Sequence, residues 1–202
     1  MALSASQLFG QVSLVKDINT TPVGLKPDND YSLRFVQVGD LAFFRSDNNG
    51  IAPALWRTDG TTDGTYELDV NLVDVGVAAG KYLIYSKYAP NGDFELWRTD
   101  GTPAGTKLLK GGLSRALYPL SFGDRAAFAI SAGNGAHSLW VTDGTVEGTK
   151  VAGQLTTTLT SSGIGIGKGQ GDQFYFTISG SDGTQFVDEW WKLDASTGET
   201  KL

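Results

Sequence analysis

Self-similarity at a period of 41 to 51 residues constrains how this 202-residue chain can fold more than any other feature. The string LWRTDGT occupies residues 55–61 and again 96–102, and in both places Gly-Thr follows after two further residues. A third copy, LWVTDGT, occupies 139–145, and a degenerate fourth, WWKLDAS, occupies 190–196. The marker residues are Trp56, Trp97, Trp140 and Trp191. A fixed period of this length indicates one supersecondary unit per repeat.

Each unit shows the alternation of apolar and polar residues that is typical of β-strands. In the second unit we expect four strands, at Leu72–Val77, Lys81–Lys87, Phe94–Thr99 and Thr106–Lys110. The 27 glycines lie mainly between such runs, where they favour tight turns, and no stretch shows a helical period of apolar residues. The sequence therefore predicts an all-β protein.

A four-stranded unit repeated every ~40 to 50 residues is typical of the blades of a β-propeller. We predict a single propeller domain over 1–202 with four four-stranded blades and one extra amino-terminal strand at 11–18. The predicted blades span approximately 31–70, 71–111, 113–153 and 155–202.

The repeated residues have structural roles in this prediction. Leu96 and Trp97 are adjacent in a strand and point to opposite faces of its sheet, so each can pack against a different neighbouring blade. Arg57 and Arg98 occupy equivalent positions and are expected on an outward strand face. The repeated carboxylates are expected to form turns, because one carboxylate per blade cannot converge to the ~5–10 Å that a glycosidase pair needs. They are Asp59, Asp100, Asp143 and Asp194.

The segment ELWRTDGTPAGT at 95–106 resembles the ELWxxDGTxxGT repeat, also termed hyalin-like, of large bacterial secreted or surface proteins. Residues 13–18, SLVKDI, are similar to the segment that usually follows the Gly-Thr of that repeat, so the resemblance runs from Gln11 to Leu202. In the fourth copy Leu193 and Ala195 replace the Thr and Gly of the turn. The resemblance implies a propeller-type fold and a location outside the cell or on its surface, and it implies no particular activity.

Composition excludes several classes of function. A net charge of −6 does not suit nucleic-acid phosphates, and a chain without cysteine has neither disulfides nor thiolate metal ligands. The single histidine, His137, excludes a multi-histidine metal site and is expected in a surface loop of the third blade. No Gly-x-Ser-x-Gly elbow is present. Residues 1–10 lack the basic and apolar regions of a secretion signal, and no apolar stretch suggests membrane insertion.

Carbohydrate recognition is the use we predict for loops on one rim of such a scaffold, because exposed aromatic rings stack on sugar faces. The candidate rings are Tyr31, Tyr88, Tyr118 and Phe186, each of which could instead pack between blades. The same loops are rich in Asn, Asp and Gly, which form ordinary turns but also suit calcium. Asp47 and Asp93 are the candidate calcium ligands, and no other cofactor is expected.

We therefore predict a non-catalytic binding or adhesion module that recognises a glycan or another surface protein. Two alternatives stay open: a glycan hydrolase or lyase with its catalytic residues in non-repeated loops, and a purely structural assembly unit. For assembly, the strand at 11–18 is expected to close the ring of its own chain, giving a monomer. In the alternative, two chains exchange this strand and form one larger ring as a homodimer.

Overall fold

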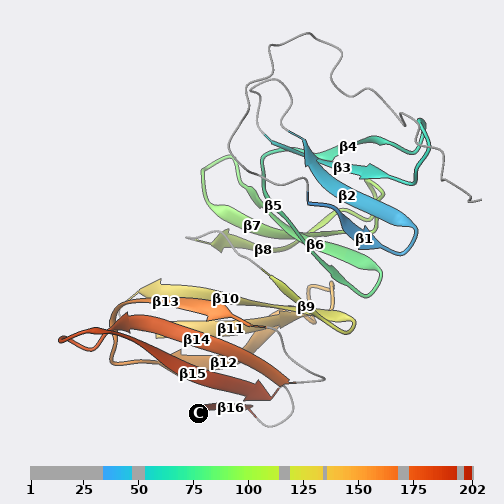
Figure 1. The fold of residues 1–202 in the computed structure, drawn as a ribbon. Helices are drawn as coiled ribbons and strands as arrows, with labels where there is room; N and C mark the ends of the chain where they lie inside the picture. The colour runs from blue at the N-terminus through green and yellow to red at the C-terminus, as the bar shows by residue number, and fades with distance from the viewer. Residues whose placement is uncertain are drawn as a thin grey trace, which may run out of the picture.

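The computed structural model describes residues 34–46, 53–113, 119–133, 136–167, 173–194 and 198–201 (Figure 1). Throughout these ranges the regular structure is β-strand, so the all-β prediction is confirmed. The predicted strand at 11–18 and three predicted site residues, Tyr31, Asp47 and Tyr118, lie outside the described residues.

Within these described ranges, sixteen strands form four antiparallel sheets of four strands each, and consecutive strands are neighbours within every sheet. The first sheet contains β1 (Val36–Val38), β2 (Leu41–Ser46), β3 (Ala54–Thr58) and β4 (Tyr66–Asp69). The second contains β5 (Leu72–Ala79), β6 (Tyr82–Tyr88), β7 (Phe94–Thr99) and β8 (Lys107–Leu113). All four strands expected in the second unit are present.

The third and fourth repeats follow the same order. The third sheet contains β9 (Leu120–Phe122), β10 (Arg125–Gly133), β11 (Ala136–Thr142) and β12 (Lys150–Thr156). The fourth contains β13 (Thr160–Ile166), β14 (Gln173–Ser181), β15 (Phe186–Asp194) and β16 (Gly198–Lys201). This up-and-down order, repeated sheet by sheet, is that of propeller blades.

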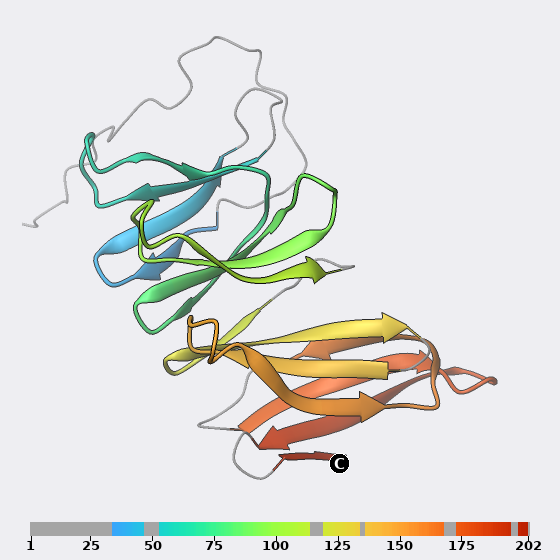
Figure 2. The ribbon, with the colours of Figure 1, turned by 180° about the vertical axis from the view of Figure 1, so that it is seen from behind.

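The sheets are stacked in chain order, with the first and fourth at opposite ends (Figures 1 and 2). Among the described residues, three buried hydrophobic clusters hold the stack together, and each lies between two consecutive sheets. In the second sheet, Leu96 belongs to the cluster shared with the third sheet, whereas Trp97 packs against the cluster shared with the first. The alternation of side chains along β7 thus gives the sheet two buried faces.

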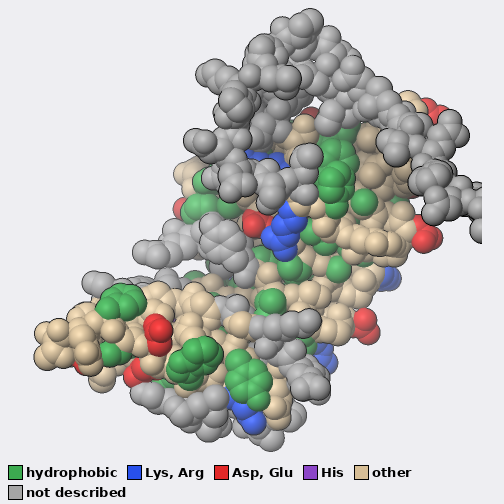
Figure 3. Space-filling model, viewed as in Figure 1, with side chains coloured by type: hydrophobic (Ala, Val, Ile, Leu, Met, Phe, Trp, Pro, Cys, Tyr) green, Lys and Arg blue, Asp and Glu red, His purple; other side chains and the backbone are tan. Residues whose placement is uncertain are grey.

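In the other sheets, too, the repeated leucine and tryptophan positions pack on opposite faces. Leu55 and Leu139 are at most 3% exposed and belong to the clusters shared with the following sheets. Trp140 and Trp191 pack against the clusters shared with the preceding sheets. In the fourth sheet the leucine position holds Trp190, which is 57% exposed, and Figure 3 shows hydrophobic side chains on the surface of β14 and β15.

Candidate ligand-binding rim

The Asp-Gly-Thr turns form closed hydrogen-bond networks. In the second sheet Asp100 Oδ1 accepts hydrogen bonds from the backbone N–H and the hydroxyl of Thr102, at 2.9 and 2.7 Å. Gly105 N–H donates to Thr102 Oγ1 at 3.0 Å, and the Thr99 and Thr106 hydroxyls are 2.8 Å apart. The first and third sheets repeat these bonds. The repeated aspartates therefore shape the hairpins.

The glycine of the following Gly-Thr pair is required because the aspartate side chain fills the space beside it. A Cβ atom placed on Gly105 would lie 2.0 Å from Asp100 Oδ1, and the same distance separates such an atom on Gly64 or Gly148 from the corresponding aspartate. The spacing of Asp-Gly-Thr from Gly-Thr in the sequence is thus a packing requirement.

Replacing Gly105 by alanine is expected to lower the free energy of unfolding by about 1–3 kcal/mol, because the new methyl group must displace the Asp100 carboxylate from its bonds. Urea denaturation followed by circular dichroism measures the change. Gly111→Ala is the matched control, since a Cβ atom there would meet no atom closer than 3.8 Å. Equal stability of the two variants would contradict the prediction.

The same bonds keep the repeated carboxyl groups ionised. Hydrogen bonds from the Thr102 side chain and backbone lower the pKa of Asp100, and Thr61 and Thr145 lower the pKa of Asp59 and Asp143 in the same way. A general acid needs a raised pKa, so the lowered pKa values of these aspartates argue against a role as general acids. The fourth repeat differs: Asp194 is the last residue of β15 and pairs with Gly198 across a much shorter connection.

Arg57 and Arg98 do not face outward as expected. Arg57 Nη1 donates to the carbonyl oxygen of Gly101 in the second sheet at 3.3 Å, and Arg98 Nη1 donates to that of Gly144 in the third at 2.5 Å. The third sheet has Val141 at this position, which belongs to the cluster shared with the fourth sheet. We call this arginine-to-glycine contact the inter-sheet clamp, and its glycines lie at the Asp-Gly-Thr turns.

A polar cluster that the sequence did not predict joins the first and second sheets. Asp69, at the end of β4, accepts hydrogen bonds from the Tyr85 hydroxyl at 2.5 Å and the Lys87 ammonium at 2.6 Å. The Lys87 and Asp69 side chains are 14% and 12% exposed, and Lys87 Nζ lies 4.6 Å from the centre of the Trp97 ring. Burial, followed by the Asp69 charge, raises the pKa of Tyr85 well above its ordinary value, so this hydroxyl stays protonated.

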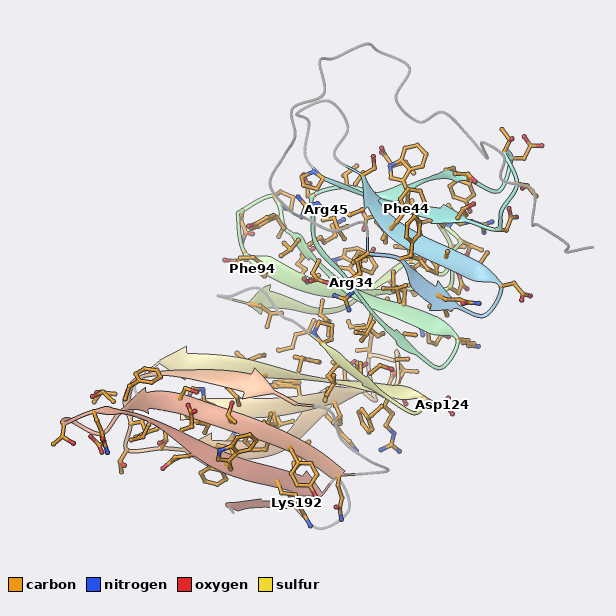
Figure 4. The ribbon with its side chains drawn as sticks, in the orientation of Figure 1. Arg34, Phe44, Arg45, Phe94, Asp124 and Lys192 are labelled. Carbon is orange, nitrogen blue, oxygen red and sulfur yellow. The ribbon has the colours of Figure 1, made fainter. Side chains whose placement is uncertain are left out.

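An aromatic pair lies beside this cluster, where β6 ends and β7 begins. Tyr88 and Phe94 are paired across the two strands with ring centroids 4.9 Å apart, and Tyr88 is 46% exposed (Figure 4 labels Phe94). The connection between them is held by hydrogen bonds, including Ala89 N–H to the Asp93 carbonyl at 2.8 Å and the Asn91 side-chain amide to the Asp93 carboxylate at 2.8 Å. A fixed, partly exposed aromatic surface results.

The corresponding connection of the fourth sheet presents a second predicted ring. Phe186, the first residue of β15, is 72% exposed. Before it, Asp182 Oδ1 accepts from the backbone N–H and hydroxyl of Thr184 at 2.8 and 2.7 Å, which repeats the Asp-Gly-Thr geometry at a different connection. Tyr88 and Phe186 therefore lie at the same kind of connection but on different sheets. The structure does not bring these two residues together into one site. We call these β6–β7 and β14–β15 connections the aromatic rim.

The surface-loop prediction for His137 is wrong. His137 lies in β11 and is 2% exposed, and burial lowers its pKa, which favours the neutral imidazole. Among the described residues no group of three or more His, Cys, Asp or Glu side chains is arranged to hold a metal ion. Nor does that part of the chain contain a helix of the length and apolarity needed to cross a membrane.

No family model and no curated protein matches the chain. Among solved structures, TolB from Acinetobacter baumannii is 15% identical, with a TM-score of 0.51 over 84% of this chain and 43% of TolB. An acylaminoacyl peptidase from Pyrococcus horikoshii is 12% identical, with a TM-score of 0.56 over 84% of this chain and 32% of the peptidase. The chain thus spans less than half the length of either protein. At such identities the similarity concerns the fold alone, and the fold is of the β-propeller type.

Proposed function

We propose that this protein is a non-catalytic binding module that acts outside the cell and recognises carbohydrate with its aromatic rim. The observation that carries the proposal is the Tyr88–Phe94 pair, in which Tyr88 is 46% exposed although its backbone is held by a hydrogen bond. The Tyr88 N–H donates to the Asn71 carbonyl at 2.9 Å, which ties the end of β6 to the link between the first two sheets. A rigid ring loses little entropy when a ligand packs on it.

The polar groups near the pair suit sugar hydroxyls. Asn91 presents a side-chain amide on the connection, which both donates and accepts hydrogen bonds, and Asp93 presents a carboxylate, which accepts them. Apolar stacking combined with a few oriented polar groups is the usual composition of small-ligand sites. Phe186 on the fourth sheet would provide a second contact, and two weak contacts on one scaffold gain from high effective concentration. The resemblance to bacterial surface repeats supports a glycan or surface protein as ligand and a place outside the cell.

A glycan array probed with the labelled chain tests the proposal, and a hit is then titrated by calorimetry. Tyr88→Ala is expected to weaken binding about fivefold, because losing one aromatic stacking contact costs on the order of 1 kcal/mol. The control is Val146→Ala, which shortens an exposed side chain on an Asp-Gly-Thr turn. Unchanged affinity of Tyr88→Ala, or no binding to any saccharide, would contradict the proposal.

Two further measurements separate the alternatives. Turnover of a panel of chromogenic glycosides would show a glycan-active enzyme and would refute the non-catalytic assignment. Repeating the titration with calcium and with a chelator tests the calcium prediction. We expect any calcium-dependent affinity to be lost in Asp93→Ala, because the carboxylate of Asp93 is the acidic group of this connection.

A further inference from the structure

The same interface occurs three times between consecutive sheets. We call the face that carries the leucine of each repeat the forward face, and the face that carries the repeated tryptophan the backward face. The forward face of each of the first three sheets is buried against the backward face of the next. Two of the three interfaces also contain the inter-sheet clamp from Arg57 or Arg98. The interface therefore has a defined direction along the chain.

The forward face of the fourth sheet lacks such a neighbour among the described residues. Trp190 occupies the leucine position and is 57% exposed, and Tyr175 on the adjacent β14 is 36% exposed. Both lie on the face opposite to Trp191 and Leu193, which pack in the cluster shared with the third sheet. Figure 3 shows hydrophobic side chains on this surface with a basic side chain beside them.

The basic group at this face is Lys192, two residues after Trp190 and therefore at the position that Arg57 and Arg98 hold in their repeats (Figure 4). Those arginines donate to the glycine carbonyl of the next Asp-Gly-Thr turn. Among the described residues, the fourth sheet thus carries a clamp donor at its forward face with no Asp-Gly-Thr turn against it.

The backward face of the first sheet carries the matching half. Phe44 and Trp56 are stacked with centroids 6.4 Å apart, and Phe35, 57% exposed, lies 5.2 Å from Phe44. The Phe44–Trp56 pair corresponds to Phe128–Trp140 and Phe176–Trp191, which are stacked against the clusters shared with the preceding sheets.

The turn of the first sheet differs from the turns of the second and third sheets in what packs against it. A Cβ atom on Gly101 or Gly144 would lie 2.4 or 2.5 Å from a side chain of the preceding sheet, Leu41 or Tyr82. At Gly60, the equivalent turn of the first sheet, such an atom would meet nothing within 4 Å. Among the described residues, the Gly60 turn therefore has the geometry of a clamp acceptor without a preceding sheet against it.

We propose that the forward face of the fourth sheet docks on the backward face of the first sheet of a second copy of this chain. Trp190 and Tyr175 pack against the Phe44–Trp56 surface, and Lys192 donates to the carbonyl of Gly60. The reciprocal contact closes a ring of eight sheets with two-fold symmetry. The second copy is favoured over closure within one chain because the first and fourth sheets lie at opposite ends of the stack and share none of the three buried clusters.

Light scattering coupled to size exclusion tests this proposal on the full chain. At micromolar concentration we expect about 43 kDa, twice the chain mass of 21.5 kDa. Trp190→Asp and Lys192→Glu are expected to shift the mass to 21.5 kDa with the circular dichroism spectrum unchanged. The control Val146→Asp places a negative charge on an exposed valine in the Asp-Gly-Thr turn of the third sheet. This sheet contributes neither of the two docking faces, so the dimer should stay intact. A wild-type mass of 21.5 kDa, or larger open assemblies, would overturn the proposal.

Site-directed crosslinking distinguishes the two-copy ring from a ring closed within one chain. The chain has no cysteine, so a variant with Lys192→Cys and Asp63→Cys carries one thiol at each proposed contact. With a short bis-maleimide we expect a covalent dimer on a denaturing gel. A crosslinked product of monomer mass would show that a single chain closes on itself and would refute the two-copy ring.

Discussion

Replacing Trp97 by alanine is expected to lower the free energy of unfolding by about 3–5 kcal/mol. The indole packs against the cluster shared by the first two sheets, lies under the Lys87 ammonium, and donates its N–H to Glu95 at 2.9 Å. The substitution removes the ring from the interface and leaves a cavity between the sheets. Urea denaturation followed by circular dichroism measures the loss.

Trp97→Phe is the control for this change. It keeps most of the buried ring and removes the hydrogen bond to Glu95, so the loss is expected to be no more than about 1.5 kcal/mol. A Trp97→Ala variant with an unchanged denaturation midpoint would place this ring outside the packing that joins the sheets.

Replacing Asp69 by alanine is expected to lower the free energy of unfolding by about 3–5 kcal/mol, although no residue of the hydrophobic clusters changes. The substitution leaves the Lys87 ammonium and the Tyr85 hydroxyl without their acceptor at a site where the lysine side chain is only 14% exposed. An uncompensated buried charge is the largest contribution to this cost. Thermal and urea unfolding of the variant measure it.

A double variant separates the charge from the shape of the site. Asp69→Leu combined with Lys87→Met removes both charges and keeps apolar volume, so it is expected to be much more stable than Asp69→Ala. Tyr85→Phe alone is expected to cost about 1 kcal/mol, the typical worth of one hydrogen bond. If the free energy of unfolding of Asp69→Ala differed from that of the unchanged chain by less than about 0.5 kcal/mol, as for an ordinary surface substitution, the ion pair would have no structural importance.

The repeat unit could be predicted from the sequence because its signals are local. The alternation along residues 94–99 fixes which face each side chain takes, and the strand in the structure has the same bounds. The turn role of Asp100 likewise depends on residues within a few positions of it. Such short-range patterns follow from backbone geometry.

Contacts between sheets could not be predicted in this way. Arg57 lies on the sheet face opposite to Trp56, as the alternation predicts. It is not on an outward surface, because the next repeat places the Gly101 turn against it. His137 is predicted in the loop before the third strand of its repeat, whereas β11 begins at Ala136 and includes it.

The partly buried ion pair of Asp69 and Lys87 left one signal in the sequence. Tyr85 occupies the position of Phe44, Phe128 and Phe176, so its hydroxyl is an addition that needs a partner. That partner, Asp69, belongs to the preceding repeat, and no pattern within one repeat could identify it. The candidate rim is similar: exposure of Tyr88 and Phe186 follows from the ends of strands, which sequence patterns locate least accurately.

The confinement of each buried cluster to two consecutive sheets has a consequence for how the molecule comes apart. The second and third sheets each take part in two clusters, whereas the first sheet takes part in one and the fourth sheet in another. In a single chain outside the proposed two-copy ring, stability is a sum of nearest-neighbour couplings, so the terminal sheets open at a lower free energy than the inner pair. Unfolding therefore proceeds inward from both ends, and the contact between Leu96 and the third sheet is among the last to break.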